Sequence, residues 1–403
     1  MKRIALSTLS LAMLATAGIA HAQSSVTLYG VIDESIQFVN NVGTPNGNKN
    51  VVGLYAGNLQ GDRWGLKGTE DLGGGLKAIF QLENGFDVNN GGLGQGGLMF
   101  GRQAFVGLDS AQFGTVTLGR QYDPLVDMIQ PLTADNYFGS TFATPGDVDN
   151  NDNSSRTNNA VKYVSPLMNG LQVEGMYAFG GVAGSTGSGQ TWGAAGTYAM
   201  GQFSIAAGYL QMDNGSTLAS RTDLTAPVGD QGVWSSGATS GAMFDSQINA
   251  GFQTAKSIGN ASVAAQYVAG PFTLAARYSN VQYKPDAFST ELNPAFVTTQ
   301  RFNVAGAYLG YQLTPAASLG LGYTYTNSSG NASASYNQIA LGADYNLSKR
   351  TDVYGVAAYQ HASGTQVNSD GTTSSAGASI GSYGNDSLSN SQTMVSVGIR
   401  HKF

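Results

Sequence analysis

The sequence is short of the residues that most often carry chemistry or cross-links. It contains no cysteine and only three histidines among 403 residues. Without cysteine the chain can form neither disulfide bonds nor thiolate metal sites. His21 lies in an N-terminal segment that we expect to be removed, which leaves only His361 and His401. We therefore expect no metal site and no cofactor.

Charged side chains are also scarce, since 19 basic and 25 acidic residues make up 11% of the chain. The net charge of −6 argues against nucleic acid as a partner, because the phosphate backbone attracts basic surfaces. After the N-terminal segment, no apolar run approaches the roughly 20 residues of a membrane-spanning helix. Helical membrane proteins are thus excluded. Disorder is excluded too, because disordered chains have few aromatics and much charge.

The one long apolar run is N-terminal. Two basic residues precede the apolar segment 4–19, and Ala-His-Ala follows at positions 20–22. A basic start, an apolar middle and a small-x-small end are typical of a secretory signal peptide. We therefore predict that residues 1–22 are removed on export and that the mature chain begins at Gln23. A retained membrane anchor is the alternative.

Glycine and aromatic residues are abundant, with 56 glycines, 20 tyrosines and 17 phenylalanines. Segments of about ten residues with alternating apolar and polar side chains recur from Val26 to Phe403. Examples are VTLYGVIDESI (from Val26), GTVTLGRQY (from Gly114) and FTLAARYSNV (from Phe272). A period of two residues is the period of a β-strand. Repeated along the whole chain, it predicts one large antiparallel sheet.

The connectors between these segments alternate between short and long. Seven short turns lie near residues 71–75, 109–114, 165–170, 200–202, 269–271, 314–317 and 347–351. Long polar stretches lie near residues 40–50, 88–97, 121–155, 181–190, 213–258, 285–299, 328–334 and 363–391. These connections predict sixteen strands, and lipid cannot satisfy an open sheet edge. The predicted fold is therefore all-β, a 16-stranded antiparallel transmembrane β-barrel over residues 23–403. A soluble, secreted β-sandwich or propeller is the alternative.

The stretch RWGLKGTEDLGGGLKAIFQLENGF, from Arg63 to Phe86, shows how charge is distributed in such a barrel. One face carries Trp64, Leu66, Leu76, Ala78, Phe80 and Leu82, and the other carries Arg63, Lys67, Lys77, Gln81 and Glu83. Placing the charged face in lipid would cost about 2–4 kcal/mol per basic residue near the midplane. The charged face is therefore predicted to line the lumen, which in a sixteen-stranded barrel is wide enough for water.

Several stretches closely resemble the trimeric general porins of Gram-negative bacteria, in their β-proteobacterial branch. They are SSVTLYGVID, DRWGLKGTEDLGGGLKAIFQLENGF, FGRQAFVGL, FGTVTLGRQYD, NNAVKYVSP and the terminal VGIRHKF. The resemblance spans residues 24–403. It implies a homotrimer in the cell outer membrane, in contact with lipid and lipopolysaccharide. It also implies that the long connector at about 121–155 folds inward as a constriction loop, and that Phe403 is read by the assembly machinery.

The same resemblance implies a set of constriction residues. Arg63, Arg102 and Arg120 match the basic wall positions, Glu83 matches an acidic position, and Arg156 follows the inward loop. Lys67 and Lys77 are expected to line the lumen nearer the periplasmic mouth. The loop lacks the Pro-Glu-Phe-Gly of the enteric pattern. The candidates for the loop carboxylates that face the arginines are therefore Asp123, Asp127 and Asp135.

These expectations predict a water-filled channel for passive diffusion of small hydrophilic solutes and ions. Rings of basic side chains favour anions, so we expect a modest anion preference; cation selectivity follows instead if the loop aspartates dominate. The competing readings are ordinary surface ion pairs, a surface adhesin, or an outer-membrane lipase or protease. Catalysis would need a base beside a nucleophile, but His361 and His401 fall at opposite strand ends. We therefore predict no enzymatic activity.

One further motif resembles a calcium loop. Asp147, Asp149 and Asn151 have the spacing of calcium ligands, but the glycine at the sixth position is missing. Asn158 also replaces the glutamate expected at the twelfth position. We interpret the segment as a solvated loop tip, with a dedicated calcium site as the alternative.

Overall fold

The structure is a computed structural model that describes residues 24–216, 221–223, 225, 234, 243–381 and 384–403. The expected signal peptide lies outside the described residues. So does part of the connector 213–258, where the alternation of the sequence is weakest.

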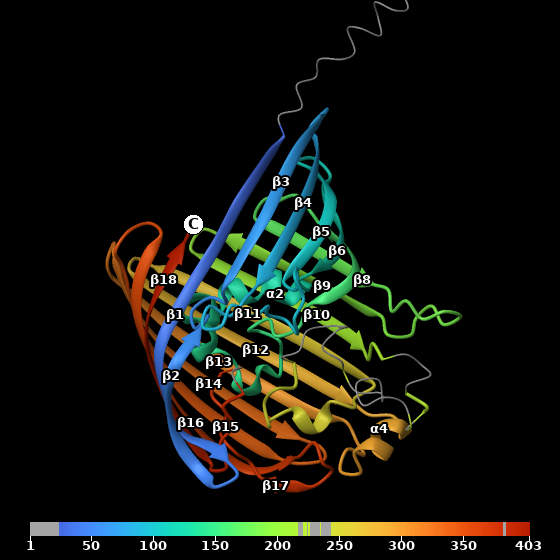
Figure 1. Ribbon diagram of the computed structural model, residues 1–403. Coiled ribbons are helices and arrows are strands. Elements are labelled where there is room, and N and C mark those ends of the chain that lie inside the picture. Colours follow the sequence, from blue (N-terminus) through green and yellow to red (C-terminus); the bar gives the residue numbers. More distant parts are fainter. Residues whose placement is uncertain (1–23, 217–220, 224, 226–233, 235–242, 382–383) are drawn as a thin grey trace, which may run out of the picture.

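The described chain is built mainly of antiparallel strands (Figure 1). The first nine are β1 (Ser25–Thr44), β2 (Gly47–Ala56), β3 (Arg63–Gly73), β4 (Leu76–Gly85), β5 (Gln103–Ser110), β6 (Gly114–Gln121), β7 (Thr157–Val164), β8 (Leu171–Ala178) and β9 (Thr191–Met200). The others are β10 (Phe203–Asp213), β11 (Ser257–Ala269), β12 (Phe272–Lys284), β13 (Gln300–Thr314), β14 (Ala317–Ser329), β15 (Ala334–Asn346), β16 (Thr351–Val367), β17 (Thr373–Ser375) and β18 (Ser391–Lys402).

These strands close into a barrel whose wall consists of sixteen strand positions, which we call staves; one stave can contain more than one strand. β2 and β3 pair with successive parts of β1, so together they form one stave that is interrupted between Gly57 and Asp62. The three-residue β17 pairs only with the end of β16 and belongs to a connector. Among the eighteen strands of the sheet, sixteen staves therefore remain. β1 also pairs with β18, which closes the cylinder and confirms the predicted fold.

The seam between the first and last staves is extended by the C-terminal residue. The backbone N–H of Phe403 donates to the carbonyl of Gly30, and Gly30 N–H donates back, both at 3.0 Å. The ring of Phe403 lies over Gly30, where a Cβ atom would be only 2.2 Å from the ring. The residue at 30 must be glycine for the terminal ring to cover the seam.

Pairing registers confirm the two faces of the Arg63–Phe86 stretch. Across β3 and β4, Leu66 pairs with Leu82 and Gly68 with Phe80, whereas Lys67 pairs with Gln81. Paired residues share a face, so the apolar and charged sets lie on opposite sides of the wall.

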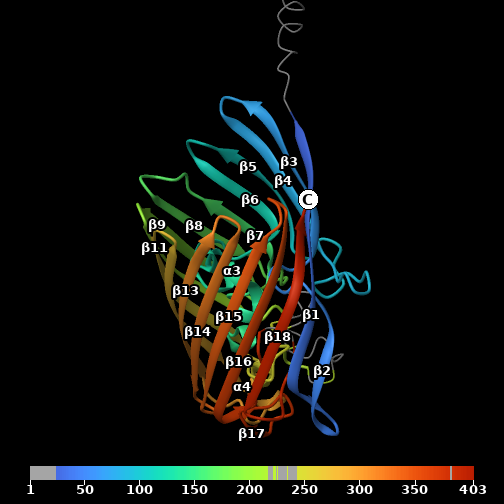
Figure 2. The ribbon, with the colours of Figure 1, turned by 90° about the vertical axis from the view of Figure 1, so that its left-hand side faces the viewer.

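Figure 2 shows the neighbouring staves β13 to β18 and β1 side by side, with β17 at the end where long connectors gather.

Two of the eight predicted long loops are tight turns. β1 runs on to Thr44 and forms a hairpin with β2, so most of residues 40–50 is strand. Likewise β14 and β15 leave only residues 330–333 between them. Both segments were predicted as loops because they are polar. A strand that extends beyond the membrane needs no apolar face, so a polar segment can still be part of a strand. The seven short turns were predicted correctly and lie at the opposite end of the barrel.

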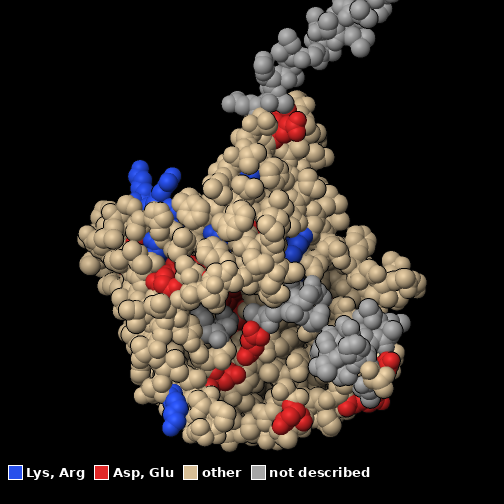
Figure 3. Space-filling view, in the orientation of Figure 1, with Lys and Arg blue, Asp and Glu red and all other residues tan. Residues whose placement is uncertain are grey.

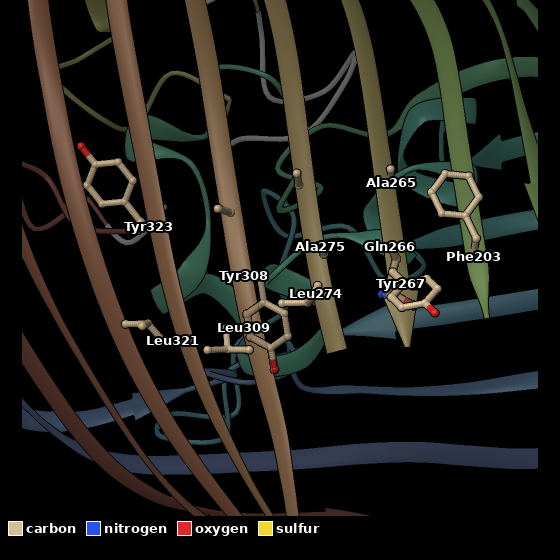
Figure 4. Close-up of a pocket in the computed structure, with 12 residues that line it drawn as sticks. Phe203, Ala265, Gln266, Tyr267, Leu274, Ala275, Tyr308, Leu309, Leu321 and Tyr323 are labelled. Carbon is tan, nitrogen blue, oxygen red and sulfur yellow. The ribbon is translucent and has the colours of Figure 1, made fainter. Parts of the chain in front are cut away.

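The outer wall is apolar and holds a shallow groove of about 420 Å³ over β11, β12 and β13. Its floor includes the small residues Ala265, Ala276 and Ala307, which pair with one another across the three strands. Exposed Tyr267 and Leu274 stand at its rim (Figure 4). The groove belongs to the face that alternation assigns to lipid.

Charged side chains cover little of the molecular face shown in Figure 3. Acidic residues lie along its lower edge, where the long loops are.

The connector between β6 and β7, residues 122–156, folds into the barrel instead of projecting from it (Figure 1). We call it the inward loop. It contains the short helices α2 (Pro124–Met128), η1 (Gln130–Leu132), α3 (Asp135–Phe138), η2 (Gly139–Phe142) and η3 (Pro145–Asp147). The other described helices are η5 (Ala250–Phe252) and α4 (Ala287–Leu292). Most side chains of the inward loop are buried, so it fills much of the lumen.

Candidate functional site

The inward loop begins with a helix whose start is fixed by its own sequence. The carboxylate of Asp123 accepts hydrogen bonds from the N–H groups of Leu125 and Val126, and Pro124 occupies the first helical turn. Both features favour a helix N-terminus. Asn150 donates a further hydrogen bond to Asp123 and so ties the two ends of the loop together. Asp123 is thus a buried helix cap and does not face the arginines.

An ion pair fastens the same helix to the wall. Lys162 of β7 pairs with Asp127 of α2 and lies 3.4 Å from Glu174 of β8. Its ammonium group also donates to the carbonyl of Tyr122. Asp127 therefore neutralises a wall lysine and is not paired with an arginine.

The far side of the loop is held by a second set of polar contacts. Arg277 of β12 forms an ion pair with Asp149 and donates to Thr144. Gln338 of β15 donates to two loop carbonyls, those of Thr141 and Ala143, at 3.2 and 3.0 Å. Asp149 is thus buried and engaged by an arginine, so the expected solvated loop tip at this segment is wrong: it is packed against the barrel wall. No group of acidic or histidine side chains that could hold a metal ion occurs among the described residues.

Between the inward loop and the wall lies a polar cavity of about 270 Å³, here called the arginine cavity. Three basic side chains line it: Arg63, Arg102 and Arg156. Two loop carboxyl groups, those of Asp135 and Asp152, line it as well. The cavity thus brings basic groups of the wall together with acidic groups of the loop.

Only one of the three arginines in the cavity has a carboxylate partner among the described residues. Arg102 Nε lies 2.8 Å from Glu83 Oε1, and Arg102 Nη2 donates to the hydroxyl of Tyr122 at 2.9 Å. Tyr122 in turn donates to Glu83. The Nε atoms of Arg63 and Arg156 are buried and have no hydrogen-bond partner in the described part of the chain. The cavity wall therefore keeps a net positive charge of fixed guanidinium groups.

Tyr122 organises this cluster. The guanidinium carbons of Arg102 and Arg156 lie 5.9 and 5.7 Å from the centre of its ring. Such distances allow cation–π attraction, which offsets part of the repulsion between neighbouring guanidinium groups. Tyr29 completes the surroundings by donating to Glu83 Oε2 at 2.8 Å. Neither tyrosine was singled out from the sequence.

One loop carboxyl group, that of Asp135, holds its proton more strongly than a free aspartate does. Burial and the neighbouring carboxyl of Asp152 hold the pKa of Asp135 well above its usual range. Gln130 donates to Asp135, and Ser140 donates to Asp152 at 3.1 Å. Asp152 was missed in the sequence because it follows a run of polar loop residues with no periodic pattern.

Arg120 does not line the arginine cavity. It pairs with Ala104, which pairs with Leu82, so the register across β4 to β6 puts it in the same row as the outward-facing Leu82, although its side chain is buried and the pairing of β6 with β7 shifts register beside it. Its Nε donates to the carbonyl of Gly101 at 2.8 Å and its Nη1 donates to Asn158. Alternation from the exposed Leu118 would have indicated this row.

Lys67 and Lys77 share the inward face of β3 and β4 but lie nearer the short turns. The ammonium of Lys67 is 5.2 Å from the centre of the Tyr29 ring. Lys77 pairs across the sheet with Asp71 and Asp109. Both lysines are exposed, and neither is among the residues lining the arginine cavity.

A closed antiparallel barrel with an apolar exterior and a charged loop inside it defines the class of outer-membrane channel proteins. Residues 7–365 match the Gram-negative porin family, and the chain belongs to this family. It is accordingly an outer-membrane porin, a channel protein and not an enzyme. Of the helices in the described residues, none is long and apolar enough to span a membrane.

Individual relatives support the same assignment. The chain is 30% identical to outer membrane porin protein 32 of Delftia acidovorans, over 98% of this chain and 99% of that protein. It is 39% identical to an outer membrane porin protein of Bordetella pertussis, over 40% of this chain and only 45% of that protein. Among solved structures, an anion-selective porin from Comamonas acidovorans is 25% identical, with a TM-score of 0.68, covering 94% of this chain and all of that one.

A more distant solved structure shares the fold. OmpT of Vibrio cholerae is 17% identical, with a TM-score of 0.61, covering 95% of this chain and all of that one. A trimer form of that protein has also been solved.

Proposed function

We propose that this porin conducts small hydrophilic solutes and ions passively with a modest preference for anions, and that the arginine cavity is its selective part. Arg63, Arg102 and Arg156 form the basic side of the constriction, and Asp135 and Asp152 form the acidic side. The observation that carries this proposal is the excess of guanidinium groups, since Glu83 is the single carboxylate paired with them among the described residues.

Electrostatics supports the predicted sign. A unit charge about 5 Å from an ion in water changes its energy by about 0.8 kcal/mol, which is about a fourfold change in local concentration. Two guanidinium groups without a carboxylate partner therefore favour an anion moderately, and salt screens the effect. The raised pKa of Asp135 acts in the same direction, because at a given pH this carboxyl group carries less negative charge than a free aspartate does. The similar porin from Comamonas acidovorans is anion-selective, which agrees with this sign.

Reversal potentials in a salt gradient across planar bilayers test the proposal. Arg156→Gln removes a buried charge without breaking an ion pair, so the anion-to-cation permeability ratio is expected to fall about two- to fourfold at low salt. Arg301→Gln is the matched control, because Arg301 is exposed on β13 and does not line the cavity.

Arg120→Gln separates the arginine cavity from the set predicted by resemblance. Because Arg120 lies in the outward row and outside the cavity lining, its replacement is expected to change the permeability ratio much less than Arg156→Gln does. A fall as large as that of Arg156→Gln would return Arg120 to the constriction. An unchanged ratio in Arg156→Gln would remove the cavity from the proposal.

We further propose a homotrimer embedded in outer-membrane lipid and lipopolysaccharide, exported after cleavage near Ala22. The trimer form of the Vibrio structure and the family resemblance support the trimer. The apolar outer wall supports contact with lipid.

A further inference from the structure

The inward loop rests on a patch of wall that has no side chains. Gly320 and Gly322 of β14 and Gly342 of β15 occupy buried positions on the inward face of their strands. Gly320 pairs with Gly342. We call these three residues the glycine socket. Inward positions of the same strands otherwise carry side chains such as Thr324 and Gln338, so the socket is a local depression in the wall.

Two loop phenylalanines occupy this depression. A Cβ atom on Gly342 would lie 2.3 Å from Cδ1 of Phe138, and one on Gly320 would lie 2.2 Å from Cε2 of the same ring. A Cβ on Gly322 would lie 2.6 Å from Cδ1 of Phe142. All three distances are far below van der Waals contact, so the fit requires glycine at each position. Both rings are almost completely buried.

The rings cannot slide sideways out of the socket. Gly342 faces one edge of the Phe138 ring and Gly320 faces the opposite edge. Phe142 stacks on Phe138 with 5.1 Å between ring centres, and Tyr308 of β13 contacts both rings edgewise or tilted at 6.3 and 6.5 Å. An atom added at Gly320 or Gly342 must therefore push Phe138 away from the wall and toward the middle of the lumen, whereas one added at Gly322 meets Phe142.

Phe138 and Asp135 are the two ends of α3, a helix of four residues. Phe138 fits into the socket, while Asp135 lines the arginine cavity. The turn is closed by hydrogen bonds from the N–H groups of Tyr137 and Phe138 to the carbonyl of Ala134, at 3.0 and 3.3 Å, so a displacement of Phe138 is transmitted through this turn to Asp135. We propose that the glycine socket sets the aperture and ion preference of the pore, because its depth fixes how close Asp135 stands to Arg63, Arg102 and Arg156.

This inference rests on the proposed conduction through the arginine cavity and adds the residues that determine its width. The socket residues act through α3 and touch no permeating ion, so they are positioning residues. A purely structural socket would stabilise the barrel without altering conduction. Conductance and permeability ratio therefore distinguish the two roles.

The test compares Gly342→Ala and Gly320→Ala with wild type in planar bilayers. Restoring ordinary contact displaces the ring by roughly 1 Å, which moves Asp135 toward the arginines and narrows the opening. We expect a loss of roughly a third of the single-channel conductance and a lower anion-to-cation permeability ratio. Gly355→Ala and Gly175→Ala are matched controls, because nothing lies closer than 3.9 Å to a Cβ at either strand position.

A double-mutant cycle identifies the ring as the link. Phe138→Ala removes atoms only, so it remains informative if an alanine in the socket prevents folding, and it should widen the opening and raise conductance. In the Phe138→Ala background, Gly342→Ala should have no further effect, because the ring that it displaces is gone. Such non-additivity reports a direct contact.

Two outcomes would overturn the inference. One is a folded Gly342→Ala porin with wild-type conductance and permeability ratio. The other is an unchanged conductance in Phe138→Ala. If wild type forms channels and Arg156→Gln alters their selectivity while the socket variants do not, only the socket is refuted. If Arg156→Gln also has no effect, the proposed function fails with it.

Discussion

At the scale of single residues, the arginine cavity depends on which charges are paired. Arg102 shares Glu83 with Tyr122, whereas Arg63 and Arg156 form no salt bridge with any described residue. Leaving buried charges unpaired is costly in a dry interior, so their persistence indicates an opening that water can reach. The unpaired charges of Arg63 and Arg156 can therefore act on permeating solutes. The paired charges of Asp127 and Asp149 instead hold the inward loop in place.

The raised pKa of Asp135 predicts a pH-dependent selectivity. As pH rises through this pKa, Asp135 loses its proton and adds negative charge opposite the arginines, so the anion preference should fall. Asp152 is the neighbouring carboxyl that raises the pKa, and Arg63, Arg102 and Arg156 line the same cavity. Reversal potentials measured from pH 4 to pH 8, a range chosen to lie above the roughly 3.9 of a free aspartate, would follow this change.

Asp135→Asn provides the comparison. Its permeability ratio should vary less with pH than that of wild type, because the variable charge is absent. Asp71→Asn is the control, since Asp71 is exposed beside a short turn. Equal pH dependence in wild type and Asp135→Asn would exclude Asp135 as the titrating group.

At the scale of elements, the inward loop is positioned by contacts at both ends. Lys162 holds α2 against β7 and β8, and Arg277 holds the segment after η3 against β12. The glycine socket holds α3 between these points. Three separate anchors over residues 122–156 explain how a loop without long helices keeps one conformation inside a wide barrel.

Removing the first anchor should loosen the loop. Lys162→Met leaves Asp127 beside Glu174, two carboxyl groups that have lost their shared cation, and breaking a buried pair in this way costs about 3–5 kcal/mol. We expect larger current fluctuations in open single channels, while the barrel remains folded because the backbone pairing of its strands is unchanged. Lys67→Met is the control, since Lys67 is exposed and bears no loop contact. Quiet channels in Lys162→Met would show that the ion pair is dispensable.

At the scale of the whole molecule, closure depends on a seam between the two ends of the chain. β1 pairs with β18 over Val31 to Val39, and Phe403 continues the seam through its two backbone hydrogen bonds with Gly30. Because an open edge in lipid would leave N–H and C=O groups without partners, the last residue contributes directly to a complete cylinder.

Deleting Phe403 should therefore lower the yield of folded barrel. Two hydrogen bonds at the seam are lost and Gly30 is uncovered. Heat-modifiable mobility in gel electrophoresis measures the folded fraction after refolding into detergent. Phe403→Tyr keeps the backbone pair and the ring and should fold like wild type, while an undiminished yield in the deletion would contradict the role of the seam.

Much of this architecture was predictable because strand alternation is a local property. The faces of the Arg63–Phe86 stretch, the seven short turns and the number of staves all follow from it. Two interpretations that did not rest on alternation differ from the strand pairing. Arg120 was grouped with the wall arginines by resemblance, whereas alternation from Leu118 assigns it to the outward-facing row, and the arginine cavity is lined without it. Residues 40–50 were predicted as a loop from polar composition, although β1 and β2 extend through them.

The apolar filling of one side of the lumen was not predictable from alternation. Inward-facing Phe302 and Met176 belong to a buried apolar cluster with Leu125 and Ile129 of the inward loop. Within a strand, such side chains look like exceptions to a polar lumen. They become intelligible only once the loop that covers them is seen inside the barrel.

The sequence by itself determined that this chain forms a closed, sixteen-stave barrel with charge on its inner face, because lipid penalises any other arrangement of alternating strands. The tertiary structure alone decided which charges meet. Asp135 lines the same cavity as the arginines and Asp123 does not, because the path of the inward loop is set by its contacts with distant strands. Those contacts join residues far apart in the chain, and no local pattern encodes their distances.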